Sequence, residues 1–256
     1  MIVALGFTLT FGAAQASADN ILPYKIHQHR LDNGLNVVTV PFPSPGLAAF
    51  YIVTRVGARN EVEDGVTGFA HFFEHMMFRG TDNYSKAEYA EALKSTGAAA
   101  NANTSQDRTE YHMTGSADKL ELMFELEADR FQNLNYSVHD FKTEAGAVKG
   151  EYTKNFASPY QQIYEKRLET AFVEHTYGHT TMGYFDDIVD MPNQYEYSLA
   201  FFDRYYRPEY NTILVVGDVT PEQVNALAEK YFGEWESGSY EAEIPVETEQ
   251  NETRYV

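Results

Sequence analysis

One short segment constrains this chain more than any other: the five residues from His71 to His75, HFFEH, inside the largely apolar stretch 66–78. The stretch contains no proline, and its apolar residues recur at helical spacing, which predicts a mostly buried helix. On such a helix His71 and His75 lie one turn apart on the same face, and Glu74 leans over that face. Three buried polar groups cost several kcal/mol unless a partner satisfies them.

A metal ion would satisfy them, because two imidazoles in this arrangement can both bind one ion. Glu74 could then take a proton from a metal-bound water without being a ligand itself. The chain has no cysteine, so thiolate sites and disulfides are excluded, and any metal must be held by His, Asp or Glu. Short motifs also occur by chance, so at this point a helix without a metal remains the alternative.

Catalytic zinc usually has three protein ligands, so this segment lacks one. A second polar helix is predicted to begin near His139, and on it Glu144 and Glu151 are seven residues apart on one face. A glutamate pair at this spacing is usually a surface feature. A carboxylate from this helix is nevertheless the natural candidate for the missing ligand.

The remaining pattern predicts strands and helices that alternate along the chain. The turn residues 32–34 predict a hairpin over 24–41, and apolar runs predict further strands at 47–56, 97–104, 109–114 and 212–217. Helices are predicted over 85–95, 117–133, 159–172, 193–206 and 221–232. The acidic residues of the helix 117–133 are expected to form a solvated face.

The strand 97–104 consists of small residues and has two interpretations. It is either a close-packed strand or an accessible edge to which an extended peptide could add as another strand. Composition does not choose between the two. Further on, His175 and His179 have helical spacing, but Gly178 and Gly183 favour a loop over a ligand-bearing helix.

The net charge of −19 argues against binding to nucleic acid or to anionic membrane surfaces, both of which attract basic patches. Residues 1–18 resemble an export signal, with a short apolar run and an A-x-A cleavage pattern at 16–18. The run is too short to indicate a transmembrane helix. We therefore expect export, to a bacterial periplasm, with a mature chain that begins near Asp19 and is not inserted in the membrane.

Taken together, the residues resemble the pitrilysin/insulinase family of zinc metallopeptidases, the inverzincins. The resemblance rests first on His71-x-x-Glu74-His75, with Glu151 at a spacing of 76 residues from His75. It also rests on segments elsewhere in the chain that match the family, namely 97–104, 107–111, Glu144, 177–179 and 215–218. The resemblance implies one zinc ion held by His71, His75 and Glu151, with Glu74 as general base. It further implies that Glu144 fixes a ligand imidazole, and that the edge strand receives the substrate through Ala99, Ala100, Asn101, Ala102 and Asn103.

The family fold implied is α+β: a largely antiparallel sheet backed by helices, a metallopeptidase half-domain of the pitrilysin and mitochondrial-processing-peptidase type. We expect a signal peptide at 1–18, the catalytic domain at 19–245, and a tail or the start of a linker at 246–256. The implied function is zinc-dependent endopeptidase activity, or its catalytic half, on extended or short peptides. The implied partner is a second homologous domain or subunit that closes over the peptide. The alternative is a non-catalytic binding or assembly subunit of the same fold.

Overall fold

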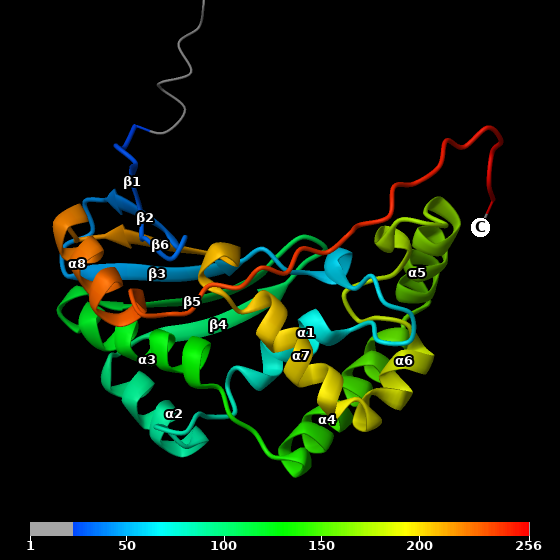
Figure 1. Ribbon diagram of the computed structural model, residues 1–256, viewed down its shortest axis with the longest axis horizontal. Coiled ribbons are helices and arrows are strands. Elements are labelled where there is room, and N and C mark those ends of the chain that lie inside the picture. Colours follow the sequence, from blue (N-terminus) through cyan, green and yellow to red (C-terminus); the bar gives the residue numbers. More distant parts are fainter. Residues whose placement is uncertain (1–22, 256) are drawn as a thin grey trace, which may run out of the picture.

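The computed structural model describes residues 23–255, and it is organised around one six-stranded sheet (Figure 1). In spatial order the strands are β1 (His27–Arg30), β2 (Asn36–Pro41), β6 (Asn211–Gly217), β3 (Leu47–Thr54), β5 (Thr109–Ser116) and β4 (Ala99–Thr104). All neighbours are antiparallel except β2 and β6, which run parallel. The expected α+β fold with a largely antiparallel sheet is confirmed.

One face of the sheet forms the core. The residues of one row across the strands, Val37, Ile213, Ile52, Tyr111 and Ala102, are paired in register and are all buried. The intervening row on the opposite face, which includes Val38, Leu214, Tyr51 and His112, is only partly buried. This alternation is the period-two pattern expected of a sheet covered by helices on one side.

The helices pack mainly beneath that buried face, as Figure 1 shows. They are α1 (Phe69–Met76), α2 (Lys86–Ser95), α3 (Leu120–Asn133), α4 (Val138–Phe156), α5 (Pro159–Ala171), α6 (Phe185–Asp190), α7 (Tyr195–Tyr205) and α8 (Pro221–Phe232). α3 and α8 contact each other and strands of the sheet, whereas α1 contacts the strands β4 and β5 on one side and α4 on the other. The position of α1 between the sheet edge and α4 determines where its polar side chains lie.

Local sequence signals account for most helix boundaries. α2 begins at Ser85, whose hydroxyl accepts a hydrogen bond from the Glu88 amide while the Glu88 carboxylate accepts one from the Ser85 amide, the predicted capping box. α4 begins with the same arrangement: the Ser137 hydroxyl accepts from the Asp140 amide, and the Asp140 carboxylate accepts from the Ser137 amide. α8 starts with Pro221 after a Thr220 cap.

Two expectations about the helices were wrong or incomplete. Glu127 and Asp129 of α3 are buried rather than solvated. Glu127 forms an ion pair with the buried Arg130, and Asp129 accepts hydrogen bonds from Thr81 and Asn83 in the loop before α2. Their partners compensate for the burial of charge, which a helical pattern alone does not reveal. The short helix α6 was not predicted at all.

The expected signal peptide at 1–18 lies outside the described residues. Within residues 23–255, no helix combines the length and the apolar character needed to cross a membrane.

Candidate metal centre

α1 presents its two histidines on one face, as the spacing predicts. The Nε2 atoms of His71 and His75 lie 3.2 Å apart, and their rings meet edge to face. His71 is buried and His75 is partly exposed. Both nitrogens therefore point toward the same small volume.

α4 brings Glu151 to that volume. Its Oε2 atom lies 3.7 Å from Nε2 of His71 and 3.4 Å from Nε2 of His75. The three ligand atoms lie within 4.8 Å of one another, and they come from two helices that pack together. The structure thus brings together the three residues that the family resemblance implies as ligands.

The donor set fits zinc. Three atoms bound tetrahedrally at 2.0–2.2 Å from one zinc ion would be separated by roughly 3.3–3.6 Å. The observed separations of 3.2, 3.4 and 3.7 Å fall close to this range. Two histidines and one glutamate also form a ligand set used by catalytic zinc sites that keep one position open.

The N-terminus of α1 is held by a carboxylate that sequence reasoning did not single out. The buried Glu61 accepts hydrogen bonds from the backbone amides of Gly68, at 2.9 Å, and Ala70, at 2.8 Å. Gly68 has a φ of 90°, which favours glycine. Burial raises the pKa of Glu61 to about 8. Through its two hydrogen bonds to backbone amides, Glu61 caps the helix that presents His71.

His75 is oriented from behind by Glu144. Its Nδ1–H donates a hydrogen bond to Oε1 of Glu144 at 2.9 Å, which leaves Nε2 free to act as a ligand. The other carboxylate oxygen of Glu144 is ion-paired with the guanidinium group of Arg79. Arg79 was missed by sequence reasoning, although it lies one helical turn beyond His75, and that spacing is the signal that could have found it.

The electrostatics of the cluster follow from burial and from these contacts. Burial, and then the neighbouring His75, lower the pKa of His71 to about 4, so this imidazole is neutral near pH 7. The hydrogen bond to Glu144 raises the pKa of His75 against the opposing effect of burial. Burial works to raise the pKa of Glu144, but His75 and Arg79 outweigh it and hold that pKa below its ordinary value. A neutral imidazole is the form that binds a metal.

Glu74 lies beside the three proposed ligands without joining them. It lines a cavity of about 540 Å³ together with His71 and Glu151. Its Oε2 atom accepts a hydrogen bond of 2.6 Å from the hydroxyl of Thr104 at the end of β4. Burial raises the pKa of Glu74, which brings this carboxylate nearer to the range in which it exchanges protons near neutral pH.

β4, which contains the residues expected to contact a peptide, is the edge strand of the sheet within residues 23–255. Ala99, Asn101 and Asn103 are exposed, Ala100 is partly buried and Ala102 is buried. The amide of Asn103 donates to Glu110 of β5 at 2.6 Å, so that side chain is turned toward its own sheet.

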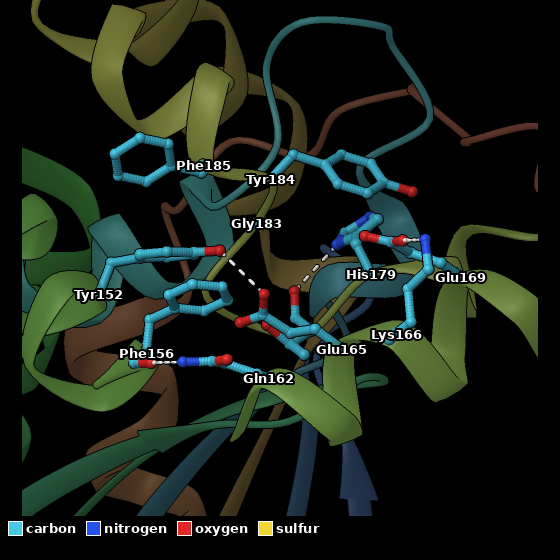
Figure 2. A pocket seen from close by; sticks show the side chains of 12 residues that line it. Tyr152, Phe156, Gln162, Glu165, Lys166, Glu169, His179, Gly183, Tyr184 and Phe185 are labelled. Carbon is cyan, nitrogen blue, oxygen red and sulfur yellow. Dashed lines mark hydrogen bonds and ion pairs between the residues drawn. The ribbon is translucent and has the colours of Figure 1, made fainter. Parts of the chain in front are cut away.

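His175 and His179 do not join the metal cluster. Nδ1 of His175 accepts a hydrogen bond from the Tyr177 amide, and Nδ1 of the buried His179 donates to the Thr180 carbonyl. His179 lines a separate cavity of about 270 Å³ between α4, α5 and the loop before α6 (Figure 2). In the same cavity the hydroxyl of Tyr152 donates to Glu165 at 2.9 Å.

Comparison with known proteins places this architecture in a family. Residues 37–184 match the family described as Insulinase (Peptidase family M16), and residues 194–256 match the one described as Peptidase M16 inactive domain. The chain therefore belongs to the insulinase family of peptidases. The boundary between the two matches falls inside one folded unit, because β6 lies between β2 and β3 in the same sheet.

Individual relatives agree with this assignment. The chain is 34% identical over 226 residues to the zinc protease PqqE of Helicobacter pylori, a match that covers 88% of this chain and 50% of that protein. It superposes on the crystal structure of a protease from Helicobacter pylori with a TM-score of 0.85 at 33% identity, covering 90% of this chain and 56% of the other. The first half of the periplasmic protease PqqL from Escherichia coli has the same fold, with a TM-score of 0.73 at 22% identity over 86% of this chain and 49% of that one. The chain spans about half the length of the curated relatives that it matches.

Proposed function

We propose that this chain is the zinc-binding, catalytic half of a metalloendopeptidase that cleaves extended or short peptides. The observation that carries the proposal is the convergence of His71, His75 and Glu151, whose ligand atoms lie within 4.8 Å of one another. The names of its relatives as zinc proteases support the same activity. In this proposal those three residues hold one zinc ion.

In the proposed reaction zinc would activate the water and the carbonyl group, and residues of the chain would transfer the proton and orient the ligands. Bound zinc lowers the pKa of a coordinated water to about 7 and polarises a carbonyl oxygen. Glu74 accepts the proton of the attacking water and returns it to the leaving amine, acting as base and then as acid. Glu144 keeps the imidazole of His75 in the tautomer and orientation that binding requires.

The edge strand β4 is the proposed platform for the peptide. An extended peptide that paired with residues 99–103 would run past Thr104 and Glu74 into the cavity that also contains His71. Only a chain segment without its own secondary structure can pair in this way. The proposed substrates are therefore unfolded segments or short peptides.

We further propose the domain organisation expected from the sequence, with an export signal at 1–18, a catalytic domain at 19–245 and a tail or linker start at 246–256. The match to the first half of PqqL supports a second homologous domain, in the same polypeptide or in a partner subunit. PqqL is described as periplasmic, which agrees with the proposed export of this chain to the periplasm.

The test is the substitution Glu74→Gln in a zinc-loaded, peptide-cleaving preparation of the protein. Zinc content should persist while turnover of short unstructured peptides collapses, because the amide cannot take the proton. A matched control is Glu91→Gln, an exposed glutamate on α2, which packs mainly against α3. Undiminished turnover in Glu74→Gln would contradict the assigned role. The alternative, a non-catalytic assembly subunit, would be supported by a purified protein without stoichiometric zinc whose partner binding is unaffected by chelator.

A further inference from the structure

The end of β4 touches the proposed general base directly. The hydroxyl of Thr104, the last residue of that strand, donates a hydrogen bond of 2.6 Å to Oε2 of Glu74. The two side chains come from different elements, the edge strand and the metal-binding helix, and both line the cavity that contains His71 and Glu151. The strand on which we place the peptide is thus also the strand that contacts the base.

Thr104 is itself held firmly by the neighbouring strand and turn. It pairs with Thr109 of β5, and the Thr109 hydroxyl donates to the Val56 carbonyl at 3.0 Å in the interior. The Ser105 amide donates to the Arg108 carbonyl at 2.8 Å, which closes the turn immediately after Thr104. The backbone at Thr104 therefore has little freedom to move.

A close backbone approach fixes the same turn from the other side. The amide of Ala58 donates to the Ser105 carbonyl at 3.3 Å, and the amide of Arg59 donates to the Gln106 carbonyl at 2.8 Å. A Cβ atom on Gly57 would lie only 2.4 Å from the Ser105 oxygen, so this approach requires glycine. The turn cannot shift away from the segment that leads into α1 without breaking these contacts.

These contacts place the Thr104 hydroxyl at a fixed point relative to α1. A glutamate side chain has three rotatable bonds, and a hydrogen bond to one carboxylate oxygen restricts how the whole carboxylate turns. Because Thr104 holds Oε2, Oε1 is the oxygen available to accept a proton in the proposed reaction. Small errors in the position of a catalytic group reduce the rate strongly, so such restriction has a kinetic value.

We propose that Thr104 is a positioning residue that orients Glu74 for proton transfer, so that the strand receiving the peptide also aims the base. This inference rests on the proposed function, because it assigns Thr104 a role in the same reaction. The role of Thr104 differs from that of residues 99–103 of β4. Those residues are expected to contact only the peptide, whereas Thr104 orients the base.

The kinetic test compares Thr104→Val, which keeps the shape but removes the hydroxyl, with Thr104→Ser, which keeps the hydroxyl. In zinc-loaded protein, Thr104→Val should lower kcat for a short unstructured peptide by about 10-fold with KM unchanged within about twofold, the pattern expected when only the reacting state loses an interaction. Thr104→Ser should restore most of kcat. Thr114→Val, at an exposed position on β5, is the matched control and should leave both constants unchanged.

Crystal structures of the wild type and of Thr104→Val give a readout that does not depend on turnover. The Glu74 carboxylate should have a single orientation in the wild type and several, or a different one, in the variant. An unchanged kcat in Thr104→Val, an equal loss in Thr104→Ser, or an unchanged Glu74 orientation would overturn the proposal. Failure of the proposed function has a different signature, namely a zinc-loaded wild type that cleaves no peptide even though Glu74 is ordered against Thr104.

Discussion

Glu144 on α4 accepts a hydrogen bond of 2.9 Å from Nδ1 of His75 on α1, so two residues 69 positions apart in sequence join their helices at the candidate metal centre. The same helix α4 also provides Glu151 two turns later. One helix therefore places both the proposed third ligand and the group that orients the second. The seven-residue spacing puts Glu144 and Glu151 on one face of α4, so both side chains can reach α1.

Removing the Glu144 carboxylate should weaken zinc binding without abolishing the fold. We expect Glu144→Gln to lower zinc affinity by about 10- to 100-fold, because the His75 ring loses its charged hydrogen-bond partner. Competition with a metal indicator measures the affinity. Lys142→Ala, an exposed change on the same helix, should leave it unchanged. Equal affinity in Glu144→Gln and the wild type would show that the contact does not support the metal.

In a variant without the Glu151 carboxylate, zinc should no longer stabilise the folded protein. A metal that binds only the folded protein stabilises it by about 4.1 kcal/mol when its concentration is 1,000 times Kd. We expect zinc to raise the Tm of the wild type and chelator to remove that increase, whereas Glu151→Gln should respond little to either. Thermal unfolding with and without zinc checks this, with Glu91→Gln as the control. A full zinc response in Glu151→Gln would exclude the residue as a ligand.

The buried Glu61 predicts a pH dependence. Burial raises its pKa from 4.5 to about 8, so over this interval the folded protein holds a proton that the unfolded chain has released. Folding stability should then fall as pH rises from about 4.5 to 8, because the folded state binds more protons than the unfolded state. Chelated wild type and Glu61→Gln are compared by denaturant unfolding at several pH values. Between pH 4.5 and about 8 the free energy of unfolding of the wild type should fall relative to that of the variant. A difference between the two that does not change with pH would contradict the raised pKa of Glu61.

The core beneath the sheet should be sensitive to truncation. The ring of Phe50 on β3 is fully buried and meets Phe124 of α3 edge to face at 4.8 Å between centroids. We expect Phe50→Ala to reduce the free energy of unfolding by about 3–5 kcal/mol, since it creates a cavity between the sheet and α3. Tyr160→Ala at an 80% exposed position should change it by less than about 0.5 kcal/mol. An equally small change in the free energy of unfolding for both variants would contradict the prediction that Phe50 is closely packed in the core.

The sequence predicts most helices and strands of this fold because the signals that begin and end them lie within a few residues of each boundary. The capping box at Ser85, the turn at 32–34 and the proline at 221 each act within a few residues, and the structure has an element boundary at each place. The pairing of β2 with β6 is different. It joins positions such as Val37 and Ile213, and no local signal records that they meet or that they run parallel.

The same distinction applies to the candidate site. Periodicity alone predicts that His71 and His75 share a helix face, and it marks Glu144 and Glu151 as a pair. That the two helices meet depends on tertiary packing, which periodicity does not report; only the missing third ligand and the family resemblance point to it. The Thr104 contact with Glu74 and the Arg79 contact with Glu144 were not predicted, because each joins side chains from separate elements.

The order of strands in the sheet has a consequence for biosynthesis. β6 lies between β2 and β3, yet among the strands of residues 23–255 it is the last in the sequence. Until the ribosome has passed Gly217, the hairpin β1–β2 and the unit β3–β5–β4 each present an unpaired inner edge, and such edges readily pair with the wrong chain. The six-stranded sheet can therefore close only after β6 has been made, because among the described strands this one alone joins the hairpin β1–β2 to the unit β3–β5–β4.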